Sequence, residues 1–278
     1  MDKILKKNIS YNLIIYLFLF WNAIKLFLID ADPIVQILNL LISIGIYFCI
    51  EDIKLEIKNK KRFGFFVGLI ILSLTIIRSF LLNSAEDKFY YINLPLGIFA
   101  LVLTLKPLNQ FFEFRNIILI SLLLPIRRLF YLLFINLLVP LTKYLTWFVL
   151  FILGKDPISY NKSLLFDDVE MIISNGCAGA DNLYFVLSAG IVYMLIFRLK
   201  NKFNILFFSI FSVLISIIIN IFRNTLIAFV VSSNKVYKDN LYNFLHDSYG
   251  SLLFSFISVT MVSVFYFKLL DRELVLQK

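Results

Sequence analysis

Three residues in the C-terminal half of the chain carry the side chains that a nucleophilic reaction needs, and the first is a cysteine. Cys177 lies in the segment SNGCAGADN, where a polar stretch turns into a hydrophobic run. The run predicts a helix that begins near Cys177, and the unpaired N–H groups at a helix N-terminus favour a thiolate. Gly176 and Gly179 allow another backbone to approach closely. The position indicates a nucleophile, and the alternative is a small packing residue.

The second residue is His246, the single histidine of the chain, in the segment NFLHDSYGS. A thiol nucleophile works with a base in hydrogen-bond reach, and a third group often orients that base. His246 is predicted at the outer start of a later membrane helix, at the same membrane depth as Cys177. Asp247 is a weak candidate for the orienting group, because neighbours on a helix point in different directions. The alternative is a histidine that only occupies the membrane boundary.

The third residue is Arg223, which follows Asn220 by one helical turn in NIFRNTL, at the outer end of an apolar run. An arginine near the centre of a membrane helix costs about 2.5–3.5 kcal/mol on insertion scales, so it usually has a role. A fixed cation stabilises a developing oxyanion strongly where water is scarce, and Arg223 suits that role. The alternative is extension to the membrane surface. That extension is expected of Arg78, whereas Lys25 is expected to pair internally.

The elements that must position these residues are membrane helices. The chain has 278 residues, of which 60% are hydrophobic and 16% charged, against about 45–50% and about 25% in soluble domains. The excess comes in blocks of about 17–25 residues, the length that crosses a bilayer. Backbone polar groups in lipid need internal partners, so these blocks are predicted to be helices. The net charge of +9 comes from basic residues at the block ends, which indicates membrane topology and no nucleic-acid partner.

The predicted fold is an all-α polytopic transmembrane bundle of about eight spans that forms a single domain. Residues 1–115 hold four N-terminal spans, and residues 116–278 hold the part with the chemistry. The fifth block runs through two prolines to Gly154, either as one span followed by an interfacial helix or as a broken span. A polar insert at 155–176 alternates weakly and indicates a short hairpin. The other predicted spans are 11–29, 33–50, 63–82, 90–105, 178–197, 203–221 or longer, and 247–267.

The distribution of lysine and arginine over short loops predicts the orientation of the spans. Basic segments alternate with less basic ones only if eight spans cross the membrane and both termini lie in the cytoplasm. Cys177, Arg223 and His246 then all lie on the outer side. The first hydrophobic block lacks a convincing cleavage site and other spans follow it, so it is predicted to be a retained span.

Several other kinds of site are excluded by residue counts and positions. Zinc takes about three or four His, Cys or carboxylate ligands, and one histidine with one outward cysteine is too few. No G-x-S-x-G motif of a serine hydrolase is present, and no cofactor is expected. Cys49 is predicted at the opposite membrane face from Cys177, too far away for a disulfide, and is expected to be a buried packing residue.

The ordered set of Cys177, Arg223 and His246 resembles the exosortase/archaeosortase family of multi-span proteins, which carry Cys, Arg and His on three successive late helices. The resemblance covers residues 116–267 well, and before that it is one of topology. Its other parts are the proline-containing run ended by Gly154, the insert that leads into the cysteine, Asn-x-x-Arg at Asn220, and a histidine followed four residues later by Gly250. Where most members carry Cys-Ser-Gly, this chain has Cys-Ala-Gly at 177–179.

The resemblance implies a cysteine protease or transpeptidase in a prokaryotic cell membrane, with its active site on the outer face. Its substrates would be exported proteins that end in a short motif, an apolar helix and a basic cluster. Cys177 would be the nucleophile, Arg223 the oxyanion stabiliser and His246 the general acid and base. Asn220, Asp247, Gly179 and Gly250 would support them. The acceptor (water, lipid or glycan) and the motif stay open.

Two alternatives from other functional classes remain at this point. A multi-span transporter or lipid flippase would use Lys25, Arg78 and Arg223 as charges along a pathway, although the sequence shows no inverted repeat. An assembly subunit would keep the three residues without catalysing a reaction.

Overall fold

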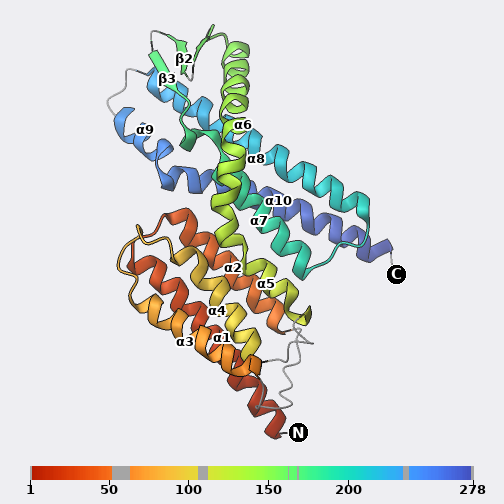
Figure 1. Ribbon diagram of the computed structural model, residues 1–278. Helices are drawn as coiled ribbons and strands as arrows, with labels where there is room; N and C mark the ends of the chain where they lie inside the picture. Colours follow the sequence, from red (N-terminus) through yellow and green to blue (C-terminus); the bar gives the residue numbers. More distant parts are fainter. Residues whose placement is uncertain are drawn as a thin grey trace. The chain divides into compact units, whose positions relative to one another are not determined.

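The computed structural model describes residues 2–51, 63–105, 112–161, 163–167, 169–233 and 238–276. It divides the chain into two compact units, residues 1–126 and 127–278 (Figure 1). The boundary falls within one long helix, eleven residues after the division between 115 and 116 that was expected from the sequence. The grouping of both parts into a single domain stays a prediction.

The first unit is a bundle of apolar helices. Its contacts join α1 to α2 and α4, α3 to α4, and α5 to both α2 and α4. The bounds of α2, α3 and α4 agree closely with the predicted spans, whereas α1 begins nine residues earlier than predicted. The helices are α1 (Asp2–Leu28), α2 (Pro33–Glu51), α3 (Phe63–Phe80), α4 (Tyr90–Leu105) and α5 (Arg115–Ser121).

A chain of buried asparagines links three helices of this unit. Asn22 of α1 donates from Nδ2 to Oδ1 of Asn39 in α2 at 2.9 Å, and Asn93 of α4 donates to Oδ1 of Asn22 at 2.8 Å. All three side chains are buried. In an apolar bundle such bonds satisfy polar groups that lipid cannot, so they hold the helices in register.

The hydrophobic run after Asn116 forms a short helix followed by a long one. The fifth block is therefore broken, and the break lies near its start. The break falls at Leu122, between α5 and α6 (Leu123–Ile152). Pro125 then lies in the first turn of α6, where a missing N–H is tolerated. Helix α6 continues through Pro140 and ends at Ile152. Gly154 follows it, and its φ of 74° is the left-handed conformation common after a helix.

The second unit places three long helices around one core. α7 (Ala180–Ile196), α8 (Lys202–Val231) and α10 (Ser248–Leu276) pack on one another. Val186, Phe208, Val262 and Tyr266 form part of the core between them. A short helix, α9 (Lys238–His246), precedes α10. The sequence predicted a loop at 232–245, and the presence of α9 corrects this prediction.

The polar insert before Cys177 folds as a three-stranded antiparallel sheet in the order β1 (Ile158–Tyr160), β2 (Ser163–Phe166) and β3 (Val169–Ile172). The expected hairpin is therefore present, with one strand more than the alternation indicated. Each turn between strands has two residues, because Tyr160 pairs with Ser163 and Phe166 with Val169. Asn161 and Asp167 open these turns at φ 46° and 49°, conformations that short polar side chains tolerate.

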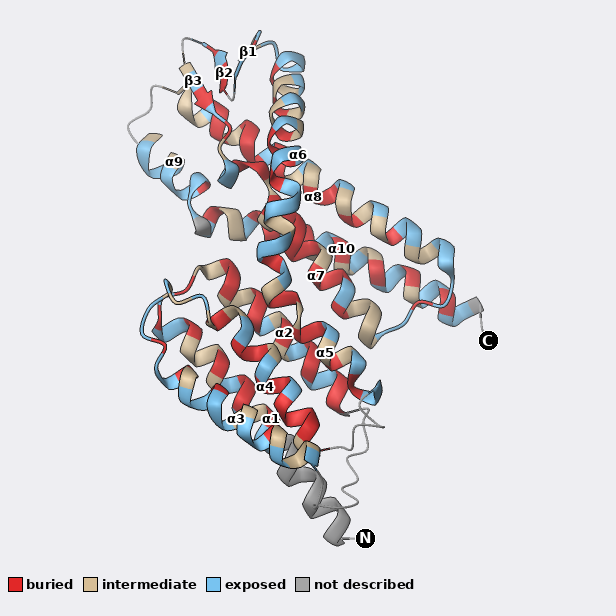
Figure 2. Cartoon of the chain, viewed as in Figure 1, coloured by how far each residue is buried: buried red, intermediate tan, exposed pale blue. Residues whose placement is uncertain are grey.

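Six of the described helices are long and apolar enough to cross a membrane, and two shorter apolar helices, Leu13–Leu28 and Tyr90–Leu105, accompany them. Much of their apolar surface is exposed, as the pale blue stretches of α3, α6 and α8 show (Figure 2). Exposed leucines and phenylalanines in such numbers are expected where lipid covers the protein. The chain is thus an all-α polytopic membrane protein. The basic segments at 52–62 and 106–111, on which the predicted orientation depends, lie outside the described residues.

Candidate functional site

Cys177 lies in a single turn of 3₁₀ helix, η2 (Asn175–Ala178), directly before α7. Helix α7 therefore begins two residues after the predicted start at 178, and Cys177 belongs to the turn that leads into it. Its own N–H donates to the carbonyl oxygen of Ser174 at 3.0 Å. The thiol is buried and forms no disulfide. The Oγ of Ser174 donates to Sγ at 3.5 Å.

Two asparagines of α8 fix the backbone of the cysteine. Nδ2 of Asn220 and Nδ2 of Asn224 donate to the carbonyl oxygen of Cys177 at 3.0 and 2.9 Å. From the opposite side, Oγ1 of Thr142 in α6 donates to the next carbonyl, that of Ala178, at 3.0 Å. The cysteine is consequently held between two long helices by hydrogen bonds to its main chain. Asn220 was expected to support the site. Asn224 was not predicted, although it follows Asn220 at helical spacing.

Gly179 is required where the turn meets α8. Its φ of 75° is left-handed, and a Cβ built on it would lie 2.5 Å from the side chain of Asn220. A larger residue would both strain the backbone and displace one of the two asparagines that hold Cys177. This geometry gives a physical reason for the predicted supporting role of Gly179.

An ion pair fixes the start of α7 from the other side of the turn. Arg127 of α6 is buried and lies 2.9 Å from Oδ1 of Asp181, to which its Nε also donates at 3.1 Å. Both nitrogens contact the same carboxylate oxygen, so the pair combines charge neutralisation with a charge-assisted hydrogen bond. Neither residue was singled out in the sequence, because a charged pair far apart along the chain has no local signature.

Arg223 is almost fully buried, at 2% exposure, and binds the end of α9. Its Nε donates to the carbonyl oxygen of Leu245 at 2.8 Å, and its Nη2 donates to that of His246 at 3.0 Å. Arg223 lies on α8 between Asn220 and Asn224, which both donate to the carbonyl oxygen of Cys177. Arg223 thus connects the segment that carries the histidine to the surroundings of the thiol.

His246 is the last residue of α9, two residues before α10 begins at Ser248, which agrees with its predicted place beside the start of the final membrane helix. The side chain is exposed, and its ring stacks on Tyr242 with centroids 5.3 Å apart and planes at 20°. Asp247 joins the two helices through its backbone, accepting from Ser251 and donating to Asn243. A Cβ on Gly250 would lie 2.0 Å from the carbonyl oxygen of Phe244, so glycine allows α9 and α10 to meet closely.

A cavity of about 500 Å³ contains both Cys177 and His246 in its wall. Met171 and Ile172 of β3 line one side, Tyr242 of α9 lines another, and Ile227 of α8 is also part of the wall. α8 contacts both β3 and α9 at this end of the unit (Figure 1). The volume is in the usual range for small-ligand sites, about 300–1,000 Å³. The fold therefore brings together, at one cavity, two residues that lie far apart in the sequence.

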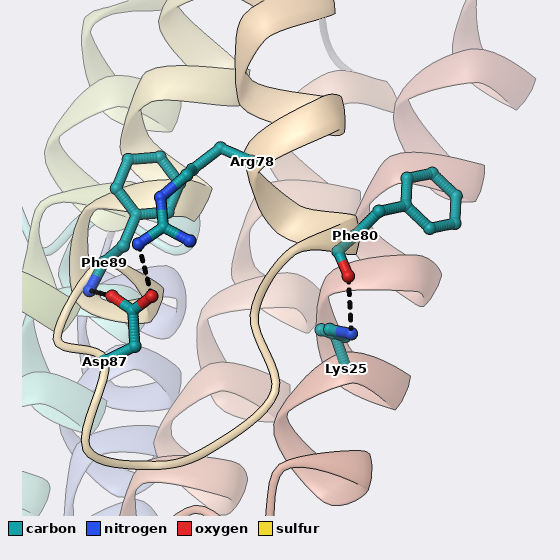
Figure 3. Close-up of polar contacts among 5 residues, drawn as sticks. All are labelled: Lys25, Arg78, Phe80, Asp87 and Phe89. Carbon is teal, nitrogen blue, oxygen red and sulfur yellow. Dashed lines mark hydrogen bonds and ion pairs between the residues drawn. The ribbon is translucent and has the colours of Figure 1, made fainter.

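The remaining charges singled out from the sequence lie in the first unit (Figure 3). Arg78 near the end of α3 forms an ion pair with Asp87 in the following loop and lies over the ring of Phe89, 5.1 Å from its centroid. Lys25 donates to the carbonyl oxygen of Phe80 at 3.4 Å. Both cations are bound near a helix end, which gives no support to a row of pathway charges. Within the described part of the chain, no group of three or more His, Cys, Asp or Glu side chains is arranged to hold a metal ion.

Comparison with known proteins gives one match. The family model for transmembrane exosortases matches residues 31–263, which is most of the chain and extends well before Asn116, where the motif resemblance begins. No curated protein and no solved structure matches the chain. The chain therefore belongs to the transmembrane exosortase family, whose general activity is the processing of sorting signals by an enzyme embedded in the membrane.

Proposed function

We propose that this protein is a cysteine protease or transpeptidase that cleaves C-terminal sorting signals from exported proteins at the outer face of the cell membrane, with both of its termini in the cytoplasm. The observation that carries the proposal is the cavity lined by both Cys177 and His246, beside which Arg223 binds the end of α9. Family membership supports the general activity. The roles of the three residues are inferred from their chemistry.

In the proposed reaction the thiolate of Cys177 attacks the carbonyl carbon of the scissile peptide bond, and the carbonyl electrons move to its oxygen. The charge of Arg223 stabilises this oxyanion. The C–N bond then breaks, His246 gives its proton to the departing amine, and a thioester remains on Cys177. His246 next takes the proton of the acceptor, which is water, a lipid or a glycan, and the acceptor displaces the sulfur.

The structure adds to the role first expected for Arg223. Two of its N–H groups already donate to the carbonyl oxygens of Leu245 and His246. Besides its charge, Arg223 therefore fixes the backbone that carries the imidazole. This dual role predicts that lysine, a compact point charge without a planar fork, replaces it poorly.

The two cysteines of the chain provide a matched test. Cys177→Ala and Cys177→Ser are expected to abolish processing of a co-expressed exported protein with a motif, apolar helix and basic cluster. Cys49→Ala, which changes a buried cysteine of α2 in the other unit, is expected to leave processing intact. Membrane insertion is measured in parallel for all variants. Normal processing by either Cys177 variant would refute the assignment of the nucleophile.

A further inference from the structure

The cavity contains an unpaired strand edge as well as reactive side chains. β3 is the last strand of the sheet, because the order is β1, β2, β3. Glu170, Met171 and Ile172 all line the cavity. Neighbouring strand residues point their side chains to opposite faces, so a cavity bordered by three successive residues runs along the edge of the strand. In the described part of the chain, no other strand pairs with this edge.

The register identifies the backbone groups that the edge presents. Phe166 and Val169 flank a two-residue turn, so they form a hydrogen-bonded pair, and Leu164 with Met171 forms the next one. The alternate residues, Glu170 and Ile172, therefore direct their N–H and C=O groups away from β2. The carbonyl oxygen of Ile172 already accepts from the N–H of Ser174 at 3.2 Å. The edge thus offers the N–H and C=O of Glu170 and the N–H of Ile172.

These three groups fit a strand added in the parallel direction. In a parallel pair, one incoming residue donates to the carbonyl of one host residue and accepts from the N–H of the host residue two positions later. Glu170 C=O and Ile172 N–H form such a pair of sites. An antiparallel strand could instead exchange both bonds with Glu170 alone, so the direction follows from the path of the chain. β3 itself runs directly into η2 and the cysteine, so a parallel peptide would run toward the thiol.

We infer that the substrate binds as an added fourth strand. Resting on the proposed function, the residues that precede the scissile bond pair in parallel with β3 through Glu170 and Ile172, and the scissile carbonyl then reaches Cys177. The wall opposite the strand is one face of α9, where Lys238, Tyr242 and His246 recur at helical spacing and line the cavity. Main-chain pairing supplies affinity for any extended peptide, and the wall supplies side-chain selectivity.

The order of elements in the substrate agrees with this direction. In the enzyme, β3 is followed by η2 and then by α7, one of the helices apolar enough to span a membrane. An exported protein with a sorting signal has the same order, a short extended motif and then an apolar helix. A parallel alignment lets both chains pass from the strand to the membrane in the same direction, without a reversal of the substrate between motif and helix.

A proline scan of the two sheet edges tests the inference on the purified full-length protein. Ile172→Pro removes the outward N–H that the proposed pair uses, whereas Ser159→Pro removes the outward N–H at the opposite edge, on β1. Proline is tolerated at such edge positions. The rate of Cys177 modification is measured by mass spectrometry with two reagents, acetyl-tetra-alanine chloromethyl ketone and iodoacetamide. Ile172→Pro is expected to slow the peptide reagent at least tenfold and to leave iodoacetamide unchanged, and Ser159→Pro to change neither.

A second measurement uses the unaltered protein, so it does not depend on how a variant folds. Each alanine of the peptide reagent is N-methylated in turn, which removes one N–H. Slowing of at least tenfold at one position, with little effect at both of its neighbours, is the expected pattern for strand pairing. Equal effects at all positions, or equal rates for the two proline variants, would overturn the added strand while leaving a reactive Cys177. A Cys177 that neither reagent modifies would overturn the proposed function and this inference together.

Discussion

The two units of the chain both bury asparagines, but they use them differently. In the first unit, Asn22, Asn39 and Asn93 bond to one another across three helices. In the second, Asn220 and Asn224 both donate to the carbonyl oxygen of a residue outside their helix, Cys177. The first arrangement holds helices together, as polar residues commonly do in membrane bundles. The second uses the same kind of amide hydrogen bond to fix the position of one cysteine.

The arginines of the two units show the same contrast. Arg78 pairs with Asp87, and its side chain is 39% exposed. Arg223 is buried and donates to the two carbonyl oxygens at the end of α9. The comparison teaches that these asparagines and Arg78 of the first unit serve stability, whereas Asn220, Asn224 and Arg223 of the second bind the backbone that carries the thiol and the imidazole. Matched substitutions in the two units can therefore break or sharpen this distinction.

The largest effect is expected from the arginine pair. Arg223→Lys loses at least one of two bonds to α9 and displaces the charge near Cys177, so processing should fall about 100- to 1,000-fold, the range for lost oxyanion stabilisation. Arg78→Lys keeps a cation beside Asp87 at a partly exposed site, where ion pairs contribute about 0–1 kcal/mol, and should leave the rate unchanged. Rates are measured per amount of folded enzyme. Similar losses in both variants would contradict the division of roles.

The asparagine pair comes next. Asn224→Ala releases the carbonyl of Cys177 from one of its two donors, and a displacement of about 1 Å at a reacting group can cost about 100-fold in rate. Asn22→Ala breaks two bonds between helices and should lower the free energy of unfolding by about 1 kcal/mol without changing the rate. Thermal unfolding and processing are measured for both. A rate loss with Asn22→Ala as large as that with Asn224→Ala would remove the contrast.

The smallest effect concerns the loop between α3 and α4. The N–H of Phe89 and the guanidinium of Arg78 both donate to Asp87 (Figure 3), and they lower the pKa of this carboxyl below its ordinary value of 3.8. A lowered pKa adds stability that is present above the ordinary value and is lost as the pH falls through the lowered one. Asp87→Asn should therefore flatten the dependence of the unfolding temperature on pH below about 4. The same pH dependence of the unfolding temperature in Asp87→Asn and in the wild-type protein would contradict this role of Asp87.

Long apolar runs made most of the fold predictable. The helices α2, α3, α4 and α7 begin and end within a few residues of the predicted spans, because lipid forces each run to satisfy its own backbone. Helix α9 was missed because it is not such an apolar run. Its nine residues are polar enough to resemble a loop, and its apolar side chains are spaced for one face of a helix that only packing against α8 and α10 makes stable.

The candidate site was predictable in its residue types and much less in its geometry. Cys177, Arg223 and His246 stand out because each is scarce or costly in an apolar chain. Asn224 and Ser174 do not, since an asparagine or serine near a helix is common, and their importance depends on a carbonyl oxygen and a sulfur from another segment. The stacking of Tyr242 on His246 could have been read from their spacing of four, had α9 been recognised.

The most direct test of the central claim is the capture of the acyl-enzyme on Cys177. The wild-type enzyme and the Cys49→Ala variant are incubated with an exported protein that carries the sorting signal, quenched in acid, and digested for mass spectrometry. The account predicts a substrate fragment attached through a hydroxylamine-sensitive thioester to the peptide that contains Cys177, in both enzymes. Processing at the normal rate with no adduct on Cys177, or with an adduct that persists in Cys177→Ala, would contradict it.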